Sequence, residues 1–404
     1  MSKKATKPTP KKSFLGRLPK AVLFGIVGVL LAAIVITVIL LIPDKNPSSS
    51  ADDPATLAPV SLIAASKDGK WGFVNTEGLW IVSPIYEDVR PFETNRLAAI
   101  KKDGKWGFVD ENGTEVISPL YQEVLKFSNG FAAVSEDGRW GFINEAGMNV
   151  ISSIYEFAGT FSANGLALVQ QNGQFGYVDS TGVLRIPIGF EAAGAFDDAG
   201  YAAVSVGGLW GFIDATGTFL IQPQYGAVGS CFRHNMAAVK TDEGWGYIDT
   251  TGNTVIAPKY EYACDFSEAG IARVKVGGQY TYINTAGSFI GQTQFQDAKD
   301  FSGGLALVTV QKQQGILKAD GSYAVAPGPF TYPGSLAQSP FLYQTADGLY
   351  GYMDHAGAIV IQAQYTAAQS FRDTGYAAVC KDGLWGLIDK NGNVVLDFQY
   401  ETLK

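Results

Sequence analysis

Residues able to act in catalysis or metal binding are few and scattered in this sequence. The 404 residues include only two histidines, His234 and His355, and neither belongs to a spaced set of metal ligands. No phosphate-binding loop, Gly-x-Ser-x-Gly turn or His-Glu-x-x-His pattern occurs. Asp-Gly pairs such as Asp103-Gly104 lack the alternating oxygen ligands of a calcium loop, and turn formation already explains them. We therefore expect no enzymatic activity, cofactor or metal, and two histidines in solvent-facing loops.

Three cysteines, Cys231, Cys264 and Cys380, are the remaining reactive side chains. Cys231 directly precedes Phe232, whereas Cys264 lies two residues before Phe266. Because side chains alternate between the two faces of an extended strand, Cys231 and Cys264 should point in opposite directions. A disulfide between them is conceivable outside the cytoplasm, but the sequence favours small buried thiols.

Four aromatic residues are candidates for binding a partner. Tyr332, Phe341 and Tyr343 lie in a stretch that also contains Pro327, Pro329, Pro333 and Pro340. A specialised surface loop with exposed rings would explain this composition, since loops on a rigid scaffold often carry function. A degenerate repeat unit is the favoured explanation, because an array tolerates the decay of one unit. Trp80 is either exposed or packed beside Trp71.

These candidates sit on a repeated framework with a period of 34 to 36 residues. One position recurs ten times, mostly as an aromatic residue followed by glycine: Trp71, Trp106, Trp140, Phe175, Trp210, Trp245, Tyr280, Gln314, Tyr350 and Trp385. A fixed period of this length is the signature of a repeat architecture. Gln314 departs most from the pattern, within the proline-rich unit.

Each unit reads as short strands joined by tight turns. Asp-Gly between two alternating apolar runs predicts a type I′ hairpin, because both central residues need positive φ. A glycine follows the aromatic position by seven residues in all ten units, as at Gly113, and predicts the left-handed residue of a three-residue hairpin. No segment after residue 43 has a helical period long enough to indicate a helix. The fold class is therefore all-β.

The last strand of each unit carries its own signals. A proline follows the aromatic position by thirteen residues in several units, as at Pro84 and Pro119. Proline cannot donate to a ladder, so this strand should be an edge or end there. The Trp-x-Phe or Trp-x-Tyr alternation places both rings on one face, which predicts an aromatic core that continues through neighbouring units.

The combined pattern, Trp-Gly-Phe-(Val/Ile)-(Asn/Asp)-x-x-Gly, then Val-Ile-x-Pro-x-Tyr, then Phe-x-x-Gly-Leu-Ala-x-Val, resembles the bacterial WG-repeat family over roughly residues 57 to 404. The resemblance implies an envelope-associated repeat array. It implies no catalytic residues.

We expect the repeat domain, residues 58–404, to form about ten β-meander units. The array begins in the middle of a unit near Ser61 and ends at Lys404, where the next connection would start. Because the array starts and ends in the middle of a unit, the carboxyl end could supply the strand that the first unit lacks. This arrangement favours a propeller-like ring. An open β-superhelix is the alternative, although neither end resembles the polar cap that solenoids need.

The first 57 residues predict a membrane tether. Residues 21–42 contain no charge and are long enough to span a bilayer as one transmembrane helix, and too long for the apolar core of a cleaved signal peptide. Residues 1–20 contain seven basic and no acidic residues, which places them in the cytoplasm and the rest outside. Residues 43–57 read as a flexible linker rich in Pro, Ser and Asp.

The charge balance bears on the partner. Seven of the 30 basic residues fall within residues 1–20, which leaves 23 against 38 acidic residues, a net charge of −15. Such an acidic body argues against nucleic acid, which needs clustered Lys and Arg. We expect a single-pass cell-membrane protein whose outward-facing repeats form a non-enzymatic scaffold for an envelope protein. A glycan or peptidoglycan-binding module is the alternative, and exposed aromatic rings would favour it.

Overall fold

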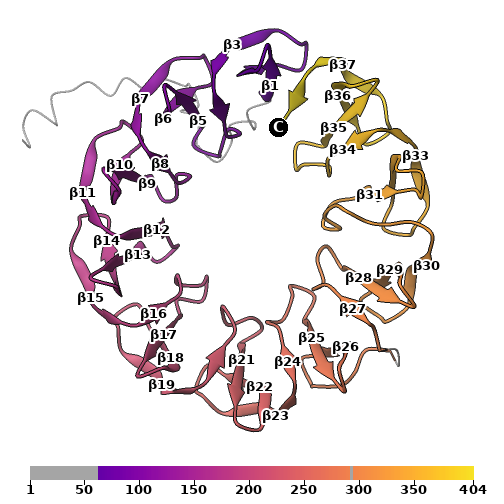
Figure 1. Cartoon of the computed structure of the whole chain (residues 1–404). Coiled ribbons are helices and arrows are strands. Elements are labelled where there is room, and N and C mark those ends of the chain that lie inside the picture. Colours follow the sequence, from indigo (N-terminus) through magenta and orange to yellow (C-terminus); the bar gives the residue numbers. More distant parts are fainter. Residues whose placement is uncertain (1–61, 292–293) are drawn as a thin grey trace, which may run out of the picture. The chain divides into compact units, whose positions relative to one another are not determined.

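The repeats form a closed ring of ten blades around an open centre (Figure 1). The structure is a computed structural model and describes residues 62–291 and 294–404. Residues 59–404 form one compact unit. The tail, span and linker predicted within residues 1–57 lie outside the described residues. The all-β fold and the propeller are confirmed, and the open superhelix is excluded.

The ten blades are numbered in chain order, and each is a four-stranded antiparallel meander or a three-stranded remnant of one. The inner strands are β4 (Asp88–Val89), β8 (Glu123–Val124), β12 (Phe157–Phe161), β16 (Ala192–Ala193), β20 (Ala227–Val228), β24 (Tyr262–Ala263), β27 (Asp297–Ala298), β34 (Ala367–Ala368) and β38 (Thr402–Leu403). The second strands are β1 (Ile63–Lys67), β5 (Leu97–Lys102), β9 (Phe131–Glu136), β13 (Leu166–Gln171), β17 (Ala202–Val206), β21 (Met236–Thr241), β25 (Ile271–Val276), β28 (Leu305–Val310), β31 (Phe341–Gln344) and β35 (Tyr376–Lys381).

The third strands carry the repeated aromatic position: β2 (Lys70–Val74), β6 (Lys105–Asp110), β10 (Arg139–Asn144), β14 (Gln174–Asp179), β18 (Leu209–Ile213), β22 (Gly244–Asp249), β26 (Gln279–Asn284), β29 (Gln313–Lys318), β32 (Tyr350–Met353) and β36 (Leu384–Asp389). The outer strands are β3 (Trp80–Tyr86), β7 (Glu115–Tyr121), β11 (Asn149–Tyr155), β15 (Leu184–Phe190), β19 (Phe219–Tyr225), β23 (Thr254–Tyr260), β30 (Tyr323–Gly328), β33 (Ile359–Tyr365) and β37 (Val394–Tyr400). The short inner strands lie nearest the centre of the ring in Figure 1.

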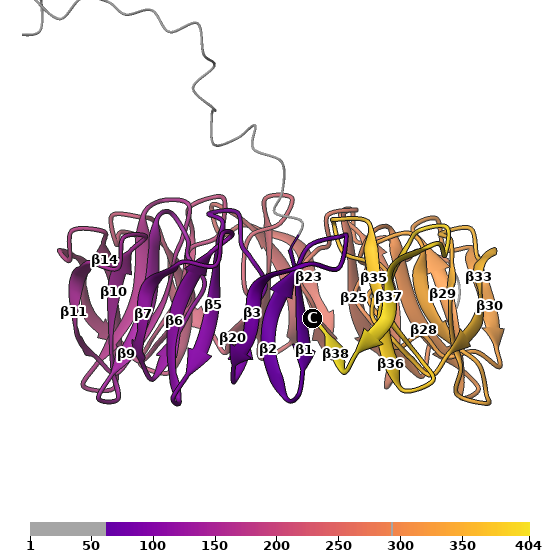
Figure 2. The ribbon, with the colours of Figure 1, turned by 90° about the horizontal axis from the view of Figure 1, so that it is seen from above.

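Both predicted turns are present. In the turn between the second and third strands of blade 2, Asp103 and Gly104 have φ of 51° and 73°, as a type I′ turn requires. In the turn between the third and outer strands, Gly113 has φ of 84° and donates its backbone N–H to the Asp110 carbonyl at 3.0 Å. The two turn types lie at opposite ends of the strands. The end of the blades that carries the turn joining β1 and β2 is called the lower rim, and the opposite end is called the upper rim (Figure 2).

The glycine after the aromatic position is required by a bulge in the outer strand. In blade 2, Trp106 pairs with Tyr121 and Phe108 pairs with Ile117, so the outer strand inserts extra residues between the two pairs. The bulge carries the outer strand across Gly107, where a Cβ would lie 2.4 Å from the Ile117 carbonyl oxygen. The repeated prolines stand at this bulge, which is one of the few places in a sheet that tolerates proline.

Blade 7 shows what happens when that glycine is replaced. The position is Thr281, and β26 has no continuous outer strand among the described residues, only isolated bridges from Tyr280 to Phe295 and from Ile283 to Phe289. A threonine side chain cannot share the space that the crossing strand occupies in the other blades. The loss of glycine and the loss of the regular outer strand therefore have one steric cause.

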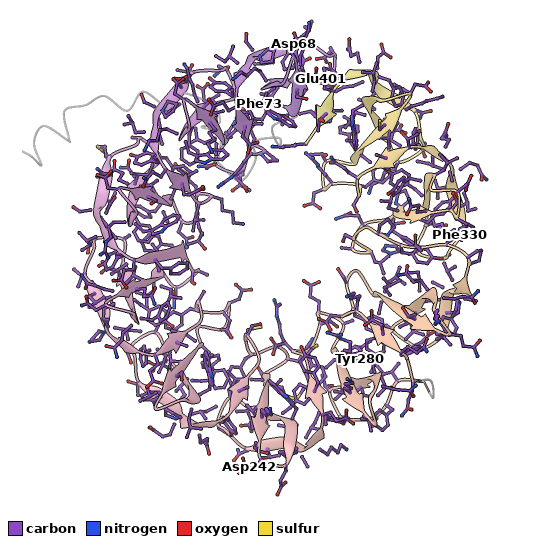
Figure 3. All side chains as sticks on the ribbon, in the orientation of Figure 1. Asp68, Phe73, Asp242, Tyr280, Phe330 and Glu401 are labelled. Atoms are coloured by element: carbon purple, nitrogen blue, oxygen red, sulfur yellow. The ribbon has the colours of Figure 1, made fainter. Side chains whose placement is uncertain are left out.

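The ring closes when the last strand joins the first blade. β38 pairs with β1 through Leu403 opposite Ala65 and Thr402 opposite Ser66. The Glu401 carboxylate accepts the backbone N–H of Gly69 at 2.9 Å, and Figure 3 shows Glu401 near Asp68 at this seam. Blade 1 is thus assembled from both ends of the repeat domain, as the permuted phase of the sequence predicts.

Hydrophobic clusters between adjacent blades hold the ring together. Each described blade buries one face against the next, and the cluster between blades 10 and 1 includes Ile63, Tyr400 and Leu403. In eight blades the buried aromatic residue of the third strand packs on a phenylalanine of the next blade's inner loop, with ring centroids 4.7 to 4.9 Å apart, as for Phe73 and Phe92. The predicted aromatic core is therefore a series of separate inter-blade clusters.

Candidate functional site on the channel wall

The aromatic rings predicted from the proline-rich unit lie in the core. Tyr332, Phe341 and Tyr343 are only 4%, 0% and 1% exposed, within the cluster between blades 8 and 9. The alternative of a surface loop with exposed rings is therefore contradicted, because the irregular unit folds its loop back into the space that a regular strand would fill; burial is consistent with the favoured explanation, a degenerate repeat unit. Gln314, which replaces the tryptophan, accepts the backbone N–H of Tyr332 at 3.0 Å and anchors this loop.

Trp80 is also a packing residue. It is half-buried at the start of β3, and its ring meets the Tyr400 ring edge-on with centroids 6.1 Å apart. Trp80 therefore belongs to the seam between blades 1 and 10, where the two ends of the repeat domain meet. None of the four predicted aromatic residues gathers with the others into an exposed site.

Within the part of the chain that the structure describes, no group of three or more His, Cys, Asp or Glu side chains could hold a metal ion. His234 is exposed, as expected, with Nε2 2.9 Å from the Ser267 carbonyl oxygen of the next blade. His355 departs from the expectation, since it is half-buried with its ring beside Phe341. All three cysteines are free thiols; Cys264 and Cys380 are buried, and Cys231 is half-buried.

The inner loops, which connect the inner strand to the second strand in eight of the blades, form the wall of the central channel (Figure 1). Each regular loop inserts its phenylalanine between two blades, and this fixes the polar residues on either side of it. Neighbouring loops are also joined by hydrogen bonds. Ser128 Oγ donates to the Phe161 carbonyl at 2.6 Å, and the Phe232 N–H donates to Asp197 at 2.9 Å.

Part of this wall is hollowed into a continuous groove across blades 5 to 9. Two adjoining hollows of about 570 and 960 Å³ share the loop of blade 6. We define the channel groove by residues 193–198, 228–233, 262–269, 300–304 and 337–338. Its charged residues come from four consecutive loops: Asp197, Asp198, Arg233, Asp265, Glu268 and Asp300. The groove is wide enough for a peptide segment or a short glycan.

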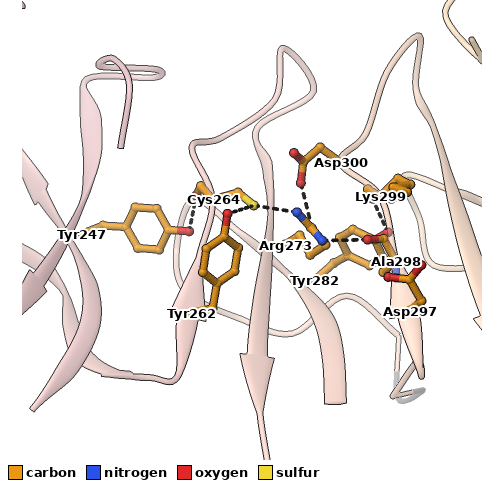
Figure 4. Close-up of polar contacts among 9 residues, drawn as sticks. All are labelled: Tyr247, Tyr262, Cys264, Arg273, Tyr282, Asp297, Ala298, Lys299 and Asp300. Atoms are coloured by element: carbon orange, nitrogen blue, oxygen red, sulfur yellow. Dashed lines mark hydrogen bonds and ion pairs between the residues drawn. The ribbon is translucent and has the colours of Figure 1, made fainter. Parts of the chain in front are cut away.

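Arg273 organises the polar part of the groove (Figure 4). Its Nε donates to Asp300 Oδ1 at 2.9 Å, its Nη1 to the Ala298 carbonyl at 2.7 Å, and its Nη2 to Cys264 Sγ at 3.1 Å. The Arg273 side chain is 15% exposed, whereas the Asp300 side chain is 57% exposed. The half-buried Arg273 thus ties blade 7 to blade 8 and holds a carboxylate toward solvent.

The ionisation of this cluster follows from its contacts. Burial by itself disfavours the charged guanidinium, but the Cys264 sulfur and the Asp300 carboxylate outweigh it and raise the pKa of Arg273. Burial raises the pKa of the Cys264 thiol. The hydrogen bond with Cys264, together with burial, raises the pKa of Tyr262 to about 12. At neutral pH the cluster therefore contains a charged arginine, a neutral thiol and a neutral phenol, so the thiol is not an activated nucleophile.

Sequence reasoning missed Arg273, although a signal was present. Six other blades have alanine at this position of the second strand: Ala64, Ala99, Ala133, Ala203, Ala238 and Ala378. An arginine within an apolar strand is costly to bury without partners. Comparison of the ten units at each position would have singled out Arg273 as a residue with a local purpose.

The repeats match a known family. The sequence profile described as "WG containing repeat" matches residues 71–312 nearly without interruption and residues 350–404. The chain belongs to the WG-repeat family. Between residues 71 and 404, the profile leaves residues 313–349 of this WG-repeat protein unmatched, which is the irregular unit around Tyr332. No curated protein matches the chain.

Several solved structures are similar to this WG-repeat protein at low sequence identity, with TM-scores below 0.5. A structure titled as a eukaryotic initiation factor is 13% identical, covers 85% of this chain and 97% of that chain, and has a TM-score of 0.48. BamB from Moraxella catarrhalis is 15% identical, covers 64% of this chain and 88% of that one, and has a TM-score of 0.36. Dihydro-heme d1 dehydrogenase NirN is 10% identical, with coverage of 87% and 75% and a TM-score of 0.40.

Within residues 62–291 and 294–404 there is no helix of the length and hydropathy needed to cross a membrane. The span predicted at residues 21–42 is outside these ranges.

Proposed function

We propose that this WG-repeat protein is a non-enzymatic scaffold, tethered to the cell membrane by residues 21–42, that binds an envelope protein on the outer side. The uncharged span and the basic residues before it support the tether and its orientation. The acidic repeat domain supports a protein partner over a nucleic acid.

The channel groove is the proposed binding site, and the observation that carries this assignment is the Arg273 cluster. Six other blades have alanine at the position of Arg273, whereas at blades 7 and 8 the channel wall departs from this pattern and places Arg273, Cys264 and Asp300 together. A half-buried arginine that holds an exposed carboxylate in a concave surface provides an oriented polar contact. Oriented polar groups in a largely preformed hollow are what a specific partner requires.

A glycan is the second candidate ligand, and one residue favours it. Tyr262 is 39% exposed and lines the groove together with Asp300 and Glu268. An exposed ring in a groove that also carries carboxylates can stack on a sugar, while the carboxylates accept hydrogen bonds from the sugar hydroxyl groups. Against this candidate, the repeated aromatic residues are used in the inter-blade clusters.

The test uses the full-length protein in detergent as bait for solubilised envelope proteins and, separately, for isolated wall polysaccharide. Arg273→Ala installs the residue that six other blades carry, so the fold should be retained. Asp300→Asn removes the charge that Arg273 holds. Arg139→Ala is the matched control, because Arg139 makes an exposed ion pair with Glu156 away from the groove.

We expect one envelope protein to be recovered equally by the wild type and Arg139→Ala, and at least about tenfold less by the two groove variants, a loss of roughly 1.4 kcal/mol. Equal recovery by all four proteins would remove the groove as the site. Salt-resistant sedimentation with polysaccharide that depends on Tyr262 would establish the glycan alternative. Labelling of a cysteine introduced at Ser49 by an impermeant reagent on intact cells tests the tether separately.

A further inference from the structure

The repeated aromatic ring of the third strand faces the next blade, and in several blades a cation of the chain itself lies on that ring. In blade 1, Lys404 Nζ is 4.1 Å from the centroid of the Trp71 ring. In blade 2, the guanidinium carbon of Arg90 is 4.4 Å from the centroid of the Trp106 ring. Both distances are in the range of a cation–π attraction. The face of this ring is therefore a place that the fold fills with a cation.

Blade 5 has the ring, Trp210, but lacks the side chain that covers it in blade 1. The backbone N–H of Lys404 donates to the Ala64 carbonyl in the second strand of blade 1. The backbone N–H of Gly194 donates to the Ala203 carbonyl in the same way, so Gly194 holds the position of Lys404. A glycine there leaves the half-buried Trp210 ring without its cation.

The other positions around the Trp210 ring are small as well. Ala203 holds the place of Arg273, which lies over the ring of blade 7 at 5.0 Å from its centroid. Ser205 holds the place of Lys101, which lies over the ring of blade 2 at 5.6 Å from its centroid. Within residues 62–291 and 294–404, the rings that have a cation over them are Trp71, Trp106, Tyr260, Tyr262 and Tyr280, and Trp210 is not among them.

A hollow of about 570 Å³ lies where larger side chains would stand in the other blades. It is lined by Trp210, Gly194 and Ala203 of blade 5 and by residues 228–233 of blade 6, and it forms the blade 5 end of the channel groove. An indole face that opens into such a hollow can accept a group from outside the chain. The ring quadrupole, negative over the face, favours a cation.

The charges of the groove favour a cation as well. The lining of the hollow carries two carboxylates, Asp197 and Asp198, against one exposed guanidinium, Arg233. The whole channel groove has five carboxylates, and three cations line or adjoin it, so the groove remains acidic when all are counted. The carboxylates are those of Asp197, Asp198, Asp265, Glu268 and Asp300, and the cations are Arg233, Arg273 and Lys299.

We infer that Trp210 is an aromatic platform that receives a lysine or arginine side chain of the protein partner, whose positive charge the carboxylates of the hollow balance. The inference rests on the proposed role of the channel groove as the partner site, and it names the side chain that enters there. Blade 1 shows the same arrangement within the chain, because the Lys404 ammonium lies over Trp71 and also pairs with Asp88. A partner's cation would supply in blade 5 what Lys404 supplies in blade 1.

Fluorine NMR of residues 59–404 labelled with 5-fluorotryptophan tests the platform directly. This fragment is a compact unit whose ring closes through its own last strand. The cationic probes are Nα-acetyl-lysine methylamide and Nα-acetyl-arginine methylamide, and Nα-acetyl-norleucine methylamide is the neutral control. Loss of one signal in Trp210→Phe assigns Trp210. We expect both cationic probes to shift the Trp210 signal and to leave the signals of Trp71 and Trp106, whose rings already have a cation, in place.

A lysine at position 194 should close the platform from within. Gly194→Lys places an ammonium at the position of Lys404, and the added Cβ would lie 3.8 Å from its nearest neighbour, so the blade can hold it. We expect the substitution to weaken binding of both cationic probes at least about fivefold. Gly159→Lys is the matched control, because Gly159 lies 35 residues earlier in blade 4, outside the groove, and an added Cβ has similar room there. It should leave probe binding unchanged.

The capture assay with solubilised envelope proteins connects the platform to the partner. Full-length Gly194→Lys should recover the envelope protein at least about fivefold less than the wild type, and Gly159→Lys should recover it equally. If the probes bind as expected but Gly194→Lys captures the partner normally, the cation does not come from the partner, and the inference fails.

The probe titration can also overturn the inference by itself. A Trp210 signal that no cationic probe shifts, that the norleucine probe shifts equally, or whose response Gly194→Lys leaves unchanged would each do so. Failure of the wild type to capture any envelope protein would instead count against the proposed scaffold, whereas the titration would still decide whether Trp210 binds a cation.

Discussion

The seam between blades 10 and 1 predicts how strongly ring closure stabilises the fold. Deletion of residues 401–404 removes Leu403, which is fully buried, together with two backbone hydrogen bonds and the bond from Gly69 to Glu401. Burial of leucine contributes about 1.5–3 kcal/mol, and each hydrogen bond about 0.5–1.5 kcal/mol. We expect the truncated ring to lose roughly 3–7 kcal/mol, a large part of the stability of an ordinary domain.

Urea unfolding of residues 59–404 measures this loss by tryptophan fluorescence, since Trp71, Trp80 and Trp385 flank the seam. Leu403→Ala isolates the apolar part and should cost about 2–4 kcal/mol. Val124→Ala is the control, because Val124 holds the corresponding position in β8, an inner strand that does not take part in closing the ring. If Leu403→Ala and the deletion leave the unfolding midpoint unchanged while Val124→Ala lowers it, the ring is not closed as described.

Two further predictions concern the repeat itself. Gly107→Ala should destabilise the ring by at least about 3 kcal/mol in urea unfolding, because the added Cβ would overlap the Ile117 carbonyl oxygen. Gly159→Ala should be tolerated, because the nearest atom would lie 3.7 Å from the added Cβ. Equal effects of the two substitutions would refute the steric explanation. Hydrogen bonds from the Thr181 and Thr251 side chains and neighbouring turn groups lower the pKa of Asp179 and Asp249 to about 2. Since an unfolded aspartate has a pKa of about 3.9, these turns stabilise the ring above about pH 4 and lose that contribution toward about pH 2. The melting temperature of the wild type should fall as the pH is lowered over this range. It should fall less in Asp249→Asn, because Asn144 makes the same turn without a charge. A pH profile of Asp249→Asn identical to that of the wild type would argue against the turn carboxylates.

The sequence by itself determined the unit and its turns. Asp-Gly pairs and the glycine seven residues after the aromatic position have few alternative conformations, so local chemistry was sufficient to predict both hairpins. The starting phase of the array also predicted closure, because a missing inner strand at Ile63 and a surplus strand at Leu403 complete one another. The turns depend on residues that are neighbours in the sequence, and ring closure depends on where within a unit the array starts and ends.

Only the tertiary structure decided which residues face solvent and which face the next blade. Tyr343 looked available beside its prolines, yet it fills the inter-blade space that the irregular unit would otherwise leave empty. Arg273 became meaningful only when the ring brought Cys264 and Asp300 to it from separate loops. Ile85, Leu120 and Ile154 share one side of the ring because the three bulges that carry them lie in neighbouring blades. Such relations depend on the curvature of the ring and on packing between blades, which no local sequence preference specifies.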